Sequence, residues 1–190
     1  MSAGPMQIEG SMLTIDKAPN KRYTKSTFLV DMGGGAQTLE QEEWVDGISA
    51  AGTVPMQPGV NTYSGDDLAR KLEDAQFNDI IRWKELGYTP TLKTKKMLDG
   101  AAVYEVDMKK VHSAVTMYFD AATFMLVGED RTESRGGQSA VVSMRYSDFR
   151  AVDGVKLPHK MTVDGGQMTM SATVTSVKQN TQIDDATFKK

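Results

Sequence analysis

Two histidines and three groups of carboxylates are the main residues of this 190-residue chain with the chemistry to bind a metal or move a proton. His159 alternates in phase with Leu157 and Met161, so it can be read as a ligand or base, or as a residue near the edge of a strand; we favour the strand. His112 lies in a lysine-rich turn, where we expect a solvated side chain. Two isolated histidines in a chain without cysteine do not make a zinc site, so we predict no metal site.

The carboxylates and glycines favour structural roles over catalysis. The acidic run in residues 40–46 lacks the alternating ligand spacing of a calcium loop, and we interpret it as a solvated strand face. Asp66-Asp67 are placed to cap a helix and complement its dipole, and Asp184-Asp185 to stabilise a turn. Gly33-Gly34-Gly35 precedes a strand-like segment rather than a helix, which predicts a turn and not a phosphate loop. No G-x-S-x-G, H-E-x-x-H or P-loop sequence occurs, so we predict a protein that is not an enzyme and has no cofactor.

Methionine is the unusual residue of this composition, with 13 in the chain. Its side chain is flexible and polarizable, which suits a pocket that adapts to several apolar ligands. Five methionines fall in the apolar phase of predicted strands: Met117, Met144, Met161, Met168 and Met170. Ordinary core packing is the alternative for any one of them. Together they favour a lipid-like cavity.

The elements that position these residues are mostly strands. Alternating segments separated by Asp-Gly, Gly-Gly and Pro-Asn turns predict roughly ten or eleven strands, paired antiparallel. One amphipathic helix is predicted over residues 66–86, with Leu68, Leu72, Ile80 and Trp83 on its apolar side. So many strands in one sheet must curl. We therefore predict a mainly β, α+β fold: a strongly curved antiparallel sheet or unclosed β-barrel, with the helix across its concave face as a lid.

Composition and charge narrow the class of protein. The length predicts a single domain over residues 1–190, with residues 1–5 as a short flexible lead. A net charge of −3 gives no reason to expect nucleic acid as a partner. No apolar run reaches the length of a transmembrane helix. Trp44 and Trp83 have two open interpretations: they line the mouth of the cavity, or they anchor the helix.

Four stretches carry a family resemblance that spans nearly the whole chain. They are residues 10–20, Trp44-Val45-Asp46-Gly47, Tyr118-Phe119-Asp120 with Ala122-Thr123, and the set from residue 146 to residue 188. The last set is the most specific and combines Tyr146-Ser147-Asp148-Phe149-Arg150, Asp153-Gly154-Val155, Leu157-Pro158, Asn180 and residues 183–188. These stretches resemble the LolA-like and LolB-like superfamily of lipoprotein carriers, in its branch of uncharacterised outer membrane lipoprotein-sorting homologues.

The resemblance implies an unclosed antiparallel barrel with a helical lid, whose cavity holds acyl chains of lipoproteins in the periplasm. It implies non-catalytic binding of a lipid, acyl chain or lipoprotein by an exported protein whose signal is absent from this sequence. The predicted cavity residues are Leu68, Leu72, Ile80, Trp83, Met117, Phe119, Met144, Met161, Met168 and Met170. The carriers place an arginine before the Pro-Asn pair, where this chain has Ala18. The alternative is a protein-interaction or sensor domain of a larger envelope protein, using the same concave face.

Overall fold

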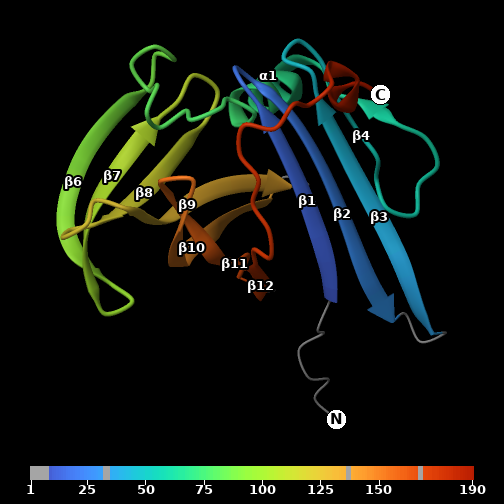
Figure 1. Ribbon diagram of the computed structural model, residues 1–190. Coiled ribbons are helices and arrows are strands. Elements are labelled where there is room, and N and C mark those ends of the chain that lie inside the picture. The colour runs from blue at the N-terminus through green and yellow to red at the C-terminus, as the bar shows by residue number, and fades with distance from the viewer. Residues whose placement is uncertain (1–8, 32–34, 136–137, 167–168) are drawn as a thin grey trace. The chain divides into compact units, whose positions relative to one another are not determined.

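A computed structural model describes residues 9–31, 35–135, 138–166 and 169–190 (Figure 1). The chain forms two compact units. Unit 1 runs as far as Arg82 and also contains Gln182–Lys190, and unit 2 is Trp83–Thr181. The chain therefore passes between the units twice. The single domain over residues 1–190 stays a prediction.

Unit 1 is built on a five-stranded antiparallel sheet whose strands lie in chain order. The strands are β1 (Glu9–Lys17), β2 (Lys21–Asp31), β3 (Ala36–Val45), β4 (Ala50–Gly52) and β5 (Asn61–Thr62). The turns between β1 and β2 and between β3 and β4 lie at the same end of the sheet, where Asn20 Nδ2 donates to the carbonyl of Gly47 at 3.0 Å. Gly47 has φ +95°, and a Cβ there would lie 2.7 Å from Asn20 Oδ1. The Asp46-Gly47 turn predicted from the sequence therefore needs its glycine.

The α-helix of unit 1, α1 (Gly65–Asp74), is shorter than predicted. Its N-cap is Ser64 rather than Asp66, and Asp66 and Asp67 lie in its first turn, where they complement the helix dipole as expected. The prediction that it continues to residue 86 is wrong, because the backbone N–H of Phe77 donates to the carbonyl of Pro19 at 2.9 Å instead of to a helix carbonyl. Asn78 then takes φ 53°, and the residues up to Gly87 form turns. The hydrogen bond to Pro19, in a turn distant in the sequence, therefore outweighs the helical preference of the residues after Asp74.

The core of unit 1 lies between α1 and its own sheet. Val45, Ala50 and Ala75 are buried, and the partly buried side chains of Tyr63, Leu68 and Leu72 pack against them. The C-terminal segment adds to unit 1 through the short 3-10 helix η1 (Asp185–Phe188), which contacts β2 and β3. Asp184 caps η1 by accepting a hydrogen bond from the Ala186 N–H at 2.9 Å, as the predicted turn requires.

Unit 2 is a seven-stranded antiparallel sheet, again with its strands in chain order. Its strands are β6 (Thr89–Leu98), β7 (Ala101–Lys109), β8 (Ala114–Asp120), β9 (Leu126–Arg135), β10 (Gln138–Val152), β11 (Val155–Asp164) and β12 (Thr169–Thr173). Figure 1 shows this sheet curving strongly from β6 to β12. Asp99 and Gly100 join β6 to β7 with φ 50° and 84°, as the predicted Asp-Gly hairpin requires.

The predicted fold class is confirmed. The described residues form two antiparallel sheets with one α-helix, and neither sheet closes into a barrel. The described residues form twelve strands, one more than the upper end of the prediction because of the two-residue strand β5.

Candidate ligand-binding site

One face of the seven-stranded sheet carries a row of mostly apolar side chains. Residues directly opposite each other in an antiparallel ladder point to the same side of the sheet. The ladder pairs run Val106↔Met117, Met117↔Glu129, Glu129↔Met144, Met144↔Val163 and Val163↔Met170. Neighbouring rows on this side hold the pairs Met108↔Val115 and Tyr146↔Met161. We call this set the apolar face.

Burial varies along the apolar face. Met108, Val115 and Met117 are 2–4% exposed, so β7 and β8 carry its buried part. Met144 and Met161 on β10 and β11 are half-buried. Apolar side chains that remain partly open across neighbouring strands offer a surface on which a ligand can bury its own apolar atoms.

A buried carboxylate interrupts the apolar face. Glu129 is 5% exposed, and its Oε1 accepts hydrogen bonds from Arg131 Nη2 at 3.0 Å and from the Tyr146 hydroxyl at 2.9 Å. Burial, together with the charge and hydrogen bond of Glu129, raises the pKa of Tyr146. A buried polar group is tolerated when it is paired and hydrogen-bonded, so these contacts compensate the burial of Glu129 and keep the Tyr146 hydroxyl protonated at neutral pH.

The opposite side of the same sheet is polar. The Tyr118 hydroxyl donates to Asp130 Oδ2 at 2.7 Å, and Arg145 Nη1 donates to Asp130 Oδ1 at 2.8 Å. Burial works against ionisation of Asp130, but these hydrogen bonds outweigh it and hold the pKa of Asp130 below its usual value. The Nζ of Lys96 lies 4.7 Å from the centroid of the Tyr118 ring. The two sides of the sheet thus differ clearly in chemistry.

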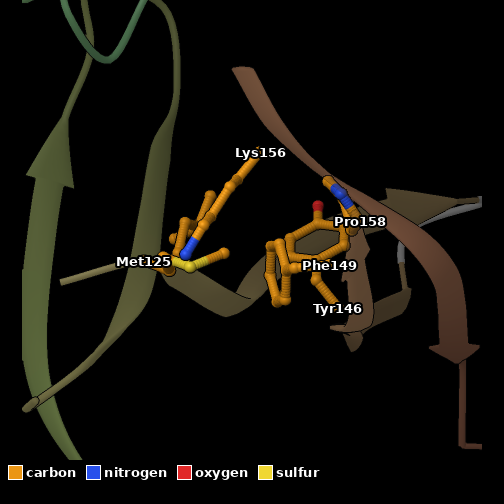
Figure 2. A pocket seen from close by; sticks show the side chains of 6 residues that line it. Met125, Tyr146, Phe149, Lys156 and Pro158 are labelled. Carbon is orange, nitrogen blue, oxygen red and sulfur yellow. The ribbon is translucent and has the colours of Figure 1, made fainter. Parts of the chain in front are cut away.

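A pocket of about 260 Å³ adjoins the apolar face (Figure 2). Its lining consists of Met125, Leu126, Tyr146, Phe149, Lys156 and Pro158. Tyr146 belongs to both the pocket and the apolar face, since it pairs with Met161. Tyr146 therefore links the pocket to the apolar face, and Met125 and Leu126 place the pocket beside the β8–β9 turn.

Two irregularities of the sheet bring the pocket residues together. The β8–β9 ladder shifts register between Tyr118 and Phe119, which places Leu126 opposite Phe119. Asp148 takes φ 53° in the middle of β10, and beyond it Phe149 pairs with Pro158. Backbone irregularities of this kind change the direction in which the side chains of the irregular strand point. In Figure 2 the rings of Tyr146, Phe149 and Pro158 lie close together, with Met125 across from them.

The residues predicted to line a cavity are divided between the units. Leu68 and Leu72 pack in the core of unit 1, and Ile80 is half-buried in the turns after α1. The remaining predicted residues belong to unit 2. Met117 is 2% exposed and Met170 is 46% exposed. The half-buried ones are Trp83, Phe119, Met144 and Met161. Met168 lies outside the described residues. The structure brings Met117, Met144, Met161 and Met170 onto one face, and the contact of any of these residues with a ligand stays a prediction.

The tryptophans and histidines take structural positions. Trp44 is 6% exposed in unit 1, with the Tyr23 ring 5.9 Å away and Lys190 Nζ 4.7 Å from its centroid. Trp83 is half-buried in unit 2, with Lys84 Nζ 5.1 Å from its ring. His159 is buried in β11, and its Nδ1 lies 3.1 Å from the carbonyl of Leu157. His112 is exposed.

Sequence reasoning missed seven residues of this site. Six line the pocket, Met125, Leu126, Tyr146, Phe149, Lys156 and Pro158, and the seventh is the buried carboxylate Glu129. Phe149 and Pro158 belong to the stretches that carry the family resemblance, which is the one signal that could have identified them. The two residues come together because they are opposite each other in the β10–β11 ladder, and the sequence of the stretches does not reveal that register.

Two searches for other kinds of site covered the described residues only. No three His, Asp or Glu side chains are grouped there to hold a metal ion. No helix in that part of the chain has the length and apolar character needed to cross a membrane.

No family model matches the sequence, and no curated protein is significantly similar to it. The fold resembles a domain described as an outer membrane lipoprotein-sorting protein from Vibrio parahaemolyticus, with a TM-score of 0.60, 11% identity and coverage of 95% of this chain and 80% of that chain. A DUF1329 family protein from Desulfovibrio piger gives 0.54 at 13% identity, covering 96% of this chain and 88% of that one. A LolA superfamily protein from Nitrosomonas europaea gives 0.49 at 13% identity, with the same coverage.

The first two of these likenesses define the class of fold. The chain shares the fold of the Vibrio parahaemolyticus domain and of the DUF1329 family protein, in agreement with the LolA-like fold that its own sequence stretches suggested.

Proposed function

We propose that this protein binds a lipid or acyl-type ligand on the apolar face of unit 2, without catalysing a reaction. The observation that carries the proposal is the row of half-buried methionines and valines on β10 and β11, next to a largely apolar pocket. The LolA-like fold supports carriage of a lipoprotein or lipid in the periplasm as the setting. The helix α1 packs against the sheet of its own unit, and its role as a lid stays a prediction.

The chemistry of the apolar face suits an acyl chain. Each methylene that such a chain buries contributes roughly 0.8 kcal/mol, so a long chain gains enough from contact alone. Met144 and Met161 can change rotamer to follow chains of different shape. The ion pair of Glu129 with Arg131 adds a polar point at which a head group can be oriented.

Displacement of a fluorescent apolar dye by palmitate tests the proposal. We expect N-phenyl-1-naphthylamine to gain fluorescence on the wild-type protein and palmitate to displace it. Met144→Glu should weaken dye binding by roughly tenfold, because the ligand must then desolvate a carboxylate. Met12→Glu is the matched control, since Met12 is 59% exposed on β1 of unit 1.

Two results would count against the proposal. One is a folded wild-type protein that takes up no dye at all. The other is an equal loss of affinity in the Met144 and Met12 variants, which would place the dye elsewhere. A partner protein that binds where palmitate does not would favour the alternative of an interaction domain.

A further inference from the structure

The pocket beside the apolar face combines an apolar lining with one ammonium group. Five of its six lining residues present mainly carbon, or sulfur in the case of Met125. The sixth is Lys156, an exposed residue near the start of β11. In Figure 2 the Lys156 side chain extends toward Met125 and its nitrogen lies beside that residue. A lysine of this kind lays its methylene stem along an apolar wall and keeps its charge at the opening.

Two carboxylates of this sheet, Asp148 and Asp120, are engaged with other groups. Arg150 contacts both oxygens of Asp148, at 3.1 and 2.6 Å. Asp120 Oδ1 accepts from the hydroxyl and the N–H of Thr123, both at 2.7 Å. Within the described part of the chain no carboxylate forms an ion pair with Lys156. Its ammonium is therefore available to an anion from outside the protein.

The volume limits what can enter. An engineered cavity of roughly 150 Å³ holds benzene, with six carbons. By proportion the pocket of about 260 Å³ holds roughly ten carbons. That is less than a whole lipid, so the occupant is a short amphiphile or the end of a longer one.

We propose that this pocket binds amphiphiles of about ten carbons with an anionic head, whose carboxylate or phosphate contacts the Lys156 ammonium. This inference rests on the proposed function and adds a charge preference to it. The chain would lie against Phe149, Pro158 and Leu126. The head would stay at the opening, where water completes its solvation.

A titration followed by NMR of [methyl-¹³C]methionine tests the charge preference. The Met125 methyl reports on the pocket, and a Met125→Leu variant assigns it. The probes are decanoate, decyl phosphate and decan-1-ol, all below micelle-forming concentrations. We expect the two anions to shift the Met125 signal and to bind about fivefold more tightly than decanol, since a charge-assisted contact at an exposed site is worth about that factor.

Two lysine variants separate a specific contact from general attraction. Lys156→Gln should weaken decanoate binding about fivefold and leave decanol within twofold. Lys160→Gln is the matched control, because Lys160 is exposed on the same strand and does not line the pocket. It should leave both affinities unchanged. A response to decanoate alone or to decyl phosphate alone would identify the head group.

The proposal is overturned if decanol binds as tightly as the anions, or if both lysine variants lose affinity equally. If the probes shift the Met144 and Met161 signals but not the Met125 signal, the pocket proposal is overturned and the proposed function stands. If the probes shift the Met125 signal but palmitate does not displace the dye, the proposed function is overturned and the pocket proposal stands.

Discussion

Tyr146 joins the two parts of the proposed site. Its hydroxyl donates to Glu129, which fixes the ring between the apolar face and the pocket. Glu129 in turn keeps Arg131 close at 3.0 Å. A single buried carboxylate thus organises one aromatic ring and one cation within an otherwise apolar surface.

Asp185 provides a test at the residue scale that depends on pH. Hydrogen bonds from Lys17 and Lys21, both at 2.7 Å, lower the pKa of Asp185 to about 2. The folded protein therefore holds this proton less tightly than the unfolded chain, whose ordinary pKa is 3.8. The ionised group adds to the free energy of unfolding above pH ~4, and the contribution is lost as the pH falls toward 2.

We expect Asp185→Asn to lower the denaturant midpoint at pH 7, and the difference from wild type to shrink below pH ~4. Chemical denaturation at several pH values measures this difference. Asp153→Asn is the control, an exposed turn residue whose φ of 48° asparagine also accepts. A constant difference between Asp185→Asn and wild type from pH 7 down to pH 2.5 would contradict the linkage.

At the scale of elements, η1 attaches the C-terminal segment to the sheet of unit 1. The Phe188 side chain is 1% exposed, while its neighbours Asp185 and Ala186 are exposed. One aromatic ring therefore anchors the C-terminal segment against β2 and β3. The segment returns to unit 1 only after the chain has completed unit 2.

Phe188→Ala should lower the free energy of unfolding by about 3–5 kcal/mol, the usual cost of removing a fully buried aromatic ring. Equilibrium denaturation gives the value. Ile48→Ala serves as the control, because Ile48 is 83% exposed and should change stability by less than about 0.5 kcal/mol. A loss of under about 1 kcal/mol in the Phe188 variant would mean that η1 is not an anchor.

Local chemistry explains which elements the sequence predicted. The Asp99-Gly100 hairpin was predictable because its turn type demands those residues. The end of α1 was not, because the N–H of Phe77 bonds to Pro19 in a turn far away in the sequence. The pocket was missed for the same reason, since the Phe149↔Pro158 pair depends on the register of two strands.

At the scale of the whole molecule, the family resemblance predicted the fold better than it predicted the site. The stretches around Tyr146 and Leu157-Pro158 pointed to the fold of lipoprotein-sorting homologues, and the chain shares its fold with the Vibrio parahaemolyticus domain of that description. Met144 and Met161 lie on one side of the seven-stranded sheet, and their contact with a ligand stays a prediction. The partition of Leu68 and Leu72 into the core of unit 1 was not foreseen, because packing partners are set by tertiary contacts rather than by helical periodicity.

Native mass spectrometry of the protein isolated from bacterial cells that express it tests the central claim, that unit 2 holds an acyl-type ligand, most directly. The wild-type protein should carry added mass that organic extraction removes and that fragments as a lipid or acyl chain. Met144→Glu should lose most of it, and Met12→Glu should keep it. A folded wild-type protein with only the mass of its own chain, or equal loading of both variants, would contradict the account.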